Sequence, residues 1–252
     1  MTSTSFGDQD VYAVGTSDVY QHGALVSRGT AAGPATVPMG RQTDFAPSVQ
    51  AGYFRHFNDS RWIWGGKASY SNLASSDTVT DARLPQAGSF TYTASGITVP
   101  FTGNAIVQSY ETTINQQIAA IPFIGRSYDR GFFYLGAGPT LSETRTNLNG
   151  LVGFADINGQ RSDVSGAPQN FSTTGWTYGA AAVVGATYFI TPSWFVDFNY
   201  IFSATNMAKG NYSSTFTNPN GVNGSLTSGT LVGNSSGSLT TQGVQLTINL
   251  AF

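Results

Sequence analysis

The sequence contains no cysteine, and charged residues make up only 10% of its 252 positions. Without cysteine, the chain has no disulfides, no thiolate metal site and no cysteine nucleophile, while the redox compartment stays open. Lysine occurs only at Lys67 and Lys209, and the net charge is −2. A chain with so little positive charge lacks the basic surface that nucleic acid requires, so we expect no nucleic-acid partner.

A long hydrophobic run is also missing. The longest weakly polar stretch, residues 180–190, is about half of the ~20 residues that a membrane helix needs. A transmembrane strand remains possible, because it needs only ~9–11 residues with one apolar face. The opening MTSTSFGDQD has neither the basic nor the apolar region of a signal peptide. We therefore expect a protein that is not exported or one whose signal peptide has been removed.

Alternation of apolar and polar residues is the dominant pattern along the chain, and it predicts an all-β protein. Seven segments show it: 44–57, 61–73, 110–128, 132–144, 174–191, 194–205 and 244–252. An eighth strand is expected before residue 44, and residues 10–28 are the best candidate for it. The whole chain, 1–252, is predicted to be one domain in which residues 1–43 supply this first strand and a loop. Gln116 interrupts the apolar face of its segment, where a bulge or a position above a membrane would explain it.

Short and long connections alternate between these segments. Those after Phe57, Tyr128 and Thr191 are short, whereas residues 74–107, 146–173 and 206–239 are long, uncharged for the most part, and rich in Gly, Ser, Thr and Asn. An up-and-down meander with tight turns at one end and long loops at the other has this spacing.

The residue types on each face distinguish a membrane barrel from a soluble one. The polar face is rich in small residues and poor in the Lys, Glu and Arg that keep a soluble sheet in solution. Aromatic residues gather near both ends of the strands, as in the interfacial girdles of membrane barrels. A soluble ligand-binding barrel is the alternative, and it predicts extraction without detergent. The predicted girdle consists of Trp62, Trp64, Tyr128, Phe133, Trp176, Tyr178, Tyr188, Trp194 and Tyr200.

Three segments carry a resemblance to a known family: GVQLTINLAF at the end, WFVDFNYIFS (194–203) and FFYLGAGP (132–139). With the alternating connections, they make residues 44–252 similar to the OmpA-like family of small outer-membrane β-barrels, which includes porin-like surface antigens. The resemblance implies an eight-stranded antiparallel up-and-down transmembrane barrel in the outer membrane of a Gram-negative bacterium, with extracellular loops. It also implies a C-terminal signal for the barrel-assembly machinery, formed here by Val244, Leu246, Ile248, Leu250 and Phe252.

The polar face of the strands would line the lumen of such a barrel. One hypothesis is a hydrogen-bonded plug that locks the barrel, and the other is a narrow, gated ion path. Lys67 and Asp197 cannot be buried there without partners. The predicted lumen residues are Gln50, Lys67, Glu111, Asn115, Gln117, Asp197, Asn199, Gln245 and Asn249.

Enzymatic chemistry has little support in the sequence. Only His22 and His56 are present, and a Ser-His-Asp set drawn around His22 has little meaning in a chain so rich in serine. We expect no catalytic site, no metal site and no cofactor. The favoured function is a structural and surface-interaction protein whose loops contact envelope or surface partners and whose wall contacts outer-membrane lipid. A narrow porin or small-solute channel is the alternative.

Overall fold

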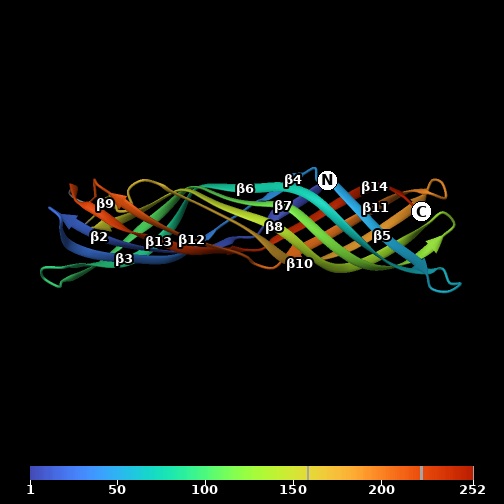
Figure 1. The fold of residues 1–252 in the computed structure, drawn as a ribbon, viewed down its shortest axis with the longest axis horizontal. Coiled ribbons are helices and arrows are strands. Elements are labelled where there is room, and N and C mark those ends of the chain that lie inside the picture. Colours follow the sequence, from blue (N-terminus) through green and yellow to red (C-terminus); the bar gives the residue numbers. More distant parts are fainter. Residues whose placement is uncertain (158, 222–223, 252) are drawn as a thin grey trace.

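The computed structural model describes residues 1–252 except 158, 222–223 and 252, and the described residues form one antiparallel sheet of 14 strands (Figure 1). The strands are β1 (Thr2–Phe6), β2 (Gln9–Gln21), β3 (Ala24–Val37), β4 (Arg41–Asp44), β5 (Ser48–His56), β6 (Trp62–Tyr92), β7 (Thr98–Tyr128), β8 (Gly131–Ile157), β9 (Gln160–Asp163), β10 (Gln169–Phe189), β11 (Trp194–Thr205), β12 (Ala208–Asn218), β13 (Leu226–Gly237) and β14 (Leu239–Leu250).

The sheet is rolled into an elongated tube, with β5, β11 and β14 toward one end and β2, β3 and β9 toward the other (Figure 1). Its order is β12-β13-β2-β3-β6-β7-β8-β10-β11-β14-β1-β4, with β5 beside β6 and β9 beside β8. We call the first end, with the short turns β5–β6, β7–β8 and β10–β11, the turn half. The other end, built from β2, β3, β9, β12, β13 and the far parts of β6, β7, β8 and β10, is called the extension.

The extension replaces the long loops that the sequence predicts. Strands β6, β7 and β8 continue through most of residues 74–107 and into 146–157 without a break in secondary structure. The expectation of loops there was wrong, because apolar residues alternate with the polar ones and supply a buried face, as at Leu84 and Val107.

The number of strands and the closure of the sheet also differ from a simple eight-stranded barrel. The long connections contribute the extra strands, and the ladder does not close, since no pairing joins β5 to β14 or β12 to β10 among the described residues. In the extension, side-chain contacts hold β12 beside β10, with the Ser214 hydroxyl 2.9 Å from Gln169 Oε1. The result is a rolled sheet whose ladder is interrupted where β5 approaches β14 and where β12 approaches β10.

The expected first strand, residues 10–28, is placed differently from the prediction. It forms most of the β2–β3 hairpin, which turns at His22 and Gly23 in the extension and pairs with β13 and β6. The terminal strand β14 pairs instead with β1, where Thr2 lies opposite Gly243. Residues 10–28 therefore form a hairpin with a β-bulge between Val19 and Tyr20, and not one strand beside β14.

Three clusters of buried apolar residues fill the inside of the tube. The turn half is filled by Ile63, Ala119, Ile121, Phe123, Phe132, Tyr134, Ala181 and Val183. A small middle cluster contains Phe6, Leu73, Ile114 and Leu239. The extension has the largest cluster, which includes Val11, Leu84, Val107, Tyr110, Leu151 and Phe216. Side chains therefore pack the interior along its length, as expected for a narrow sheet cylinder.

Strand β7 changes face between Ile114 and Gln116. The register against β8 shifts there and leaves Asn115 without a partner in the ladder, so the bulge lies next to Gln116 as the sequence suggests. Ile114 is buried before the shift and Gln117 after it. The bulge thus moves the buried set from even-numbered to odd-numbered residues.

Within the part of the chain that the structure describes, no helix has the length and apolar character needed to cross a membrane.

Candidate functional site

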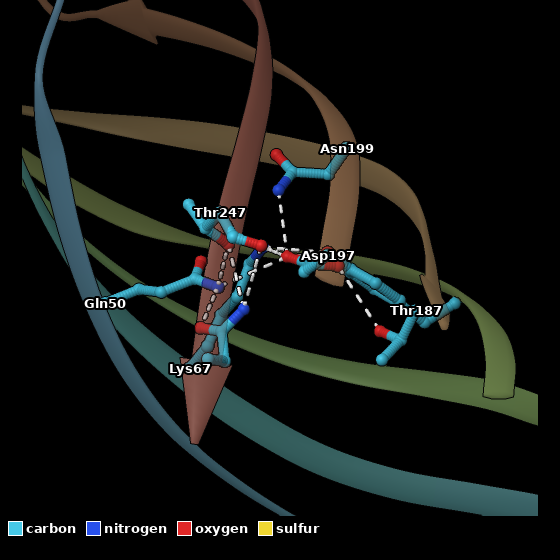
Figure 2. Close-up of polar contacts among 8 residues, drawn as sticks. Gln50, Lys67, Thr187, Asp197, Asn199 and Thr247 are labelled. Carbon is cyan, nitrogen blue, oxygen red and sulfur yellow. Dashed lines mark hydrogen bonds and ion pairs between the residues drawn. The ribbon is translucent and has the colours of Figure 1, made fainter. Parts of the chain in front are cut away.

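A cluster of polar side chains lies inside the turn half (Figure 2). Lys67 comes from β6, Tyr134 from β8, Thr187 from β10, and Asp197 and Asn199 from β11. Each residue is on the inner face because side chains alternate along a strand, and the preceding and following residues point outward. Five residues from four strands, β6, β8, β10 and β11, therefore converge on one level of the interior.

The centre of this cluster is a buried ion pair. Lys67 Nζ lies 3.6 Å from Asp197 Oδ2, and the two side chains are only 9% and 5% exposed. Tyr134 joins both charges, because Lys67 Nζ donates to its hydroxyl at 2.9 Å and the hydroxyl donates to Asp197 Oδ1 at 2.8 Å. A buried charge needs an opposite charge and hydrogen bonds to be tolerated, and this arrangement supplies both.

Further donors complete the shell of the Asp197 carboxylate. The Thr187 hydroxyl donates to Oδ1 at 3.3 Å, and the Asn199 amide donates to Oδ2 at 3.0 Å. Gln50 Nε2 approaches Oδ2 at 3.3 Å from β5. A carboxylate surrounded by so many donors is a poor general base, since its lone pairs are already used.

Gln50 links the cluster to the terminal strand. Its Nε2 donates to Thr247 Oγ1 at 2.8 Å and to Asn249 Oδ1 at 2.9 Å. The Asn249 amide in turn donates to Thr247 Oγ1 at 3.0 Å. These contacts cross from β5 to β14, which are not paired by their backbones.

A second polar layer lies farther from the short turns. Gln117 Nε2 donates to the hydroxyls of Ser142 and Ser203, each at 3.0 Å. The Ser203 hydroxyl is also hydrogen-bonded to Thr241 of β14. All four side chains are buried, so this layer joins β7, β8, β11 and β14 across the interior.

The structure brings together six of the residues that the sequence predicts for the lumen, and it separates others. Gln50, Lys67, Asp197, Asn199 and Asn249 lie in or beside the main cluster, and Gln117 lies in the second layer. Gln245 is half-buried and pairs in register with Asn199.

Glu111 and Asn115 are corrections to the predicted lumen set. The bulge reverses the faces of β7, so Glu111 lies between the buried Tyr110 and Thr112 and accepts from the Asn147 amide at 2.8 Å. Asn115 is the unpaired residue of the bulge itself. The prediction failed here because it carried one alternation through the whole strand.

Three residues of the cluster were missed by the sequence analysis: Tyr134, Thr187 and Thr247. Their positions on the polar face could have identified them, since Tyr134 alternates with Phe133 and Leu135, and Thr247 alternates with Leu246 and Ile248. That signal gives the face of each residue but not its partners across the lumen.

The outer face of the turn half is apolar and aromatic. All nine residues of the predicted girdle are exposed, from 39% at Tyr128 to 72% at Tyr178. Trp62, Tyr128 and Trp194 lie at the short turns, while Tyr178 and Tyr200 lie opposite Leu141 and Val244, farther along the sheet. In β14, the four alternating residues Val244, Leu246, Ile248 and Leu250 are 45–73% exposed, and Phe252 lies outside the described residues.

The two histidines lie at opposite ends of the molecule. His22 is exposed in the β2–β3 turn of the extension, whereas His56 is exposed at the β5–β6 turn, with Nδ1 3.1 Å from the Ser60 carbonyl oxygen. Within the described ranges, no group of three or more His, Asp or Glu side chains could hold a metal ion.

No protein-family model and no curated protein matches the sequence. The fold is an antiparallel all-β sheet, and it is similar to solved structures of Ail, the attachment invasion locus protein of Yersinia pestis, and of the outer membrane protease OmpT from Escherichia coli.

Ail is 14% identical with a TM-score of 0.25, over 92% of this chain and 98% of its own. OmpT is 15% identical with a TM-score of 0.28, over 94% and 95%. Similarities this low define neither function nor site residues, and they do not establish membership of the OmpA-like family.

Proposed function

We propose that the chain is an integral outer-membrane protein whose turn half spans the bilayer. The observation that carries this proposal is the inverted polarity of the turn half. Its outer face exposes aromatic and aliphatic side chains, including Phe133, Leu135 and Leu246, while a charged pair and amides are buried inside. A water-soluble sheet buries its apolar face and exposes its polar one, so this arrangement suits lipid outside and a polar lumen within.

The extension has the opposite surface and is proposed to lie in water outside the cell. Few large apolar residues are exposed there, and the outer positions of β2, β3 and β13 are mostly small and polar. Its apolar residues are instead buried in the largest internal cluster. A rigid sheet that projects from the membrane is suited to display, so we assign the protein a structural and surface-interaction role with envelope or surface partners.

The lumen of the turn half is proposed to be a plug, not a pore. Hydrogen bonds tie the Lys67–Asp197 pair across the lumen, and aromatic residues such as Phe123 and Phe132 pack on the side away from β14. An open ion path would need a continuous hydrated passage along the tube, and the apolar clusters in the middle and in the extension interrupt it. We propose no catalytic role, since Asp197 already accepts hydrogen bonds from several donors and both histidines are distant from it.

The C-terminal alternation is proposed to be the signal for the barrel-assembly machinery. Val244, Leu246, Ile248 and Leu250 form a continuous apolar row on the outer face of β14. Such a row is accessible to another protein before the barrel meets lipid, and Phe252 would complete it.

Epitope tags at the two ends of the tube test the location and orientation. A tag inserted between His22 and Gly23, in the open turn of the extension, should bind antibody on intact cells. The matched tag between Asn58 and Asp59, in the β5–β6 turn, should bind only after the outer membrane is permeabilised. Both tagged proteins should sediment with the outer membrane and require detergent for extraction.

The two tags control for each other, because both lie in exposed turns. If only the Asn58–Asp59 tag is accessible on intact cells, the orientation is reversed. If plain buffer extracts the protein, the membrane proposal fails.

A further inference from the structure

Two strand edges without a backbone partner face an open seam in the turn half. Strand β5 is paired only with β6, and residues 245–250 of β14 are paired only with β11. Because hydrogen bonds alternate in direction along an antiparallel strand, the backbone groups of Leu246 and Ile248 point away from β11, toward the seam. By the same alternation, those of Gln50 and Gly52 point away from β6, toward the seam from the other side.

Farther from the short turns, strand β1 fills the gap between β14 and the segment that leads into β5. It lies between β14 and β4 and is antiparallel to both, so Thr2 is opposite Gly243 on one side and Asp44 on the other. The last rung joins Met1 to Val244: the Val244 N–H donates to the Met1 carbonyl oxygen at 3.0 Å, and the amino group donates back at 3.1 Å. A segment that continued β1 in the N-terminal direction from this pair would run directly into the seam.

A cavity of about 500 Å³ lies along the seam. It is lined by Gln50–Phe54 of β5 on one side and Ile248–Ala251 on the other. On its inner side it opens into the lumen, where the Lys67–Asp197 pair and aromatic residues including Phe132 complete the lining. Unpaired backbone at this level is costly in any apolar surrounding, and an open strand edge is a template for another strand.

We infer that the seam holds one further strand, antiparallel to both β5 and β14, formed by a segment that leads into Thr2–Phe6 in a longer form of this chain. The occupant is therefore a stretch of the same polypeptide with alternating apolar and small residues. This inference goes beyond the proposed function, because it rests on sheet geometry and the cavity, whichever solvent surrounds the wall.

The registers of β1 with β14 and with β4 predict the same inward and outward positions for this added strand. Continued in register, the position two residues before Met1 falls between Leu246 and Pro47 and faces outward, so it suits an apolar side chain. The position five residues before Met1 falls between Asn249 and Gln50 and faces inward. Since Gln50 Nε2 and Asn249 Oδ1 already meet at 2.9 Å, that position has room only for glycine, alanine or serine.

A segment added before Met1 of the full chain tests the inference. The added segment alternates valine at outward and glycine or serine at inward positions, in the register set by Met1 and Val244. We expect amide hydrogen exchange at Leu246, Ile248, Gln50 and Gly52 to slow on the order of 100-fold, because these groups become paired. A matched segment shifted by one inserted residue reverses every side chain and should give no such protection.

A second variant of the added N-terminal segment places tryptophan at the position five residues before Met1. This variant should lose most of the protection. Val183 of the β10 ladder serves as a check that each protein is folded, because its exchange should not change. Absence of protection by the in-register segment, or equal protection by the shifted one, overturns the inference. Protection in the unextended chain also overturns it: concentration-dependent protection would indicate a second copy, and concentration-independent protection direct pairing of β5 with β14.

Discussion

Replacing Asp197 by alanine is expected to destabilise the protein by about 3–5 kcal/mol, because it leaves the Lys67 ammonium buried without an opposite charge. The substitution also removes the acceptor for Tyr134, Thr187 and Asn199. A double variant, Asp197→Leu with Lys67→Met, should recover much of this loss, since a buried ion pair and an apolar pair of similar volume are often close in stability.

Asp18→Ala is the matched control for this experiment. Asp18 forms a second ion pair, with Arg28 at 3.0 Å, but this pair lies at the surface of the extension, where the Arg28 and Asp18 side chains are 69% and 33% exposed. An exposed pair contributes about 0–1 kcal/mol, so Asp18→Ala should have a small effect. Urea unfolding in detergent micelles measures both variants, and equal effects would contradict a buried, enclosed cluster.

The same proteins test the plug in planar bilayers. The wild type should show no steady current, because the hydrogen-bonded Lys67–Asp197 pair crosses the lumen and the middle apolar cluster fills it farther along. Steady open-state current that changes with Lys67 or Asp197 substitution would instead favour the narrow-channel alternative.

Replacing Leu246 by arginine is expected to destabilise the protein in lipid by about 2–4 kcal/mol, as for a charge near the midplane of an outer-membrane barrel. Leu246 is 69% exposed and pairs with Phe198 of β11. Along β11, Phe198 lies between Trp194, which is near the short turns, and Tyr200, which is farther from them. In the proposed orientation, this position is in contact with the hydrocarbon core.

Val232→Arg is the control, because Val232 is an exposed valine on β13 of the extension. A surface position in water should tolerate the change within about 0.5 kcal/mol. Folding into lipid vesicles, followed by denaturant titration, gives both values. If Leu246→Arg is as mild as Val232→Arg, the outer face of the turn half does not contact lipid.

The faces of individual strands could be predicted because they depend on local alternation alone. In β11, Phe198 and Tyr200 lie outside while Asp197 and Asn199 lie inside, and a pattern with a period of two contains this information directly. The same reasoning failed in β7, where the bulge beside Gln116 reversed the faces and moved Glu111 out of the predicted set. A bulge adds one residue, and one residue is enough to exchange the two faces.

The sequence by itself determined that the chain is all-β, that its strands have one apolar and one polar face, and that short turns gather at one end. The tertiary structure alone decided that Lys67 meets Asp197 through Tyr134, that most of the predicted long loops continue as strands, and that an unpaired seam lies between β5 and β14. The physical reason is that alternation is a property of neighbours along the chain. Partners across the interior depend on the register of strands that are distant in sequence, and local composition does not encode it.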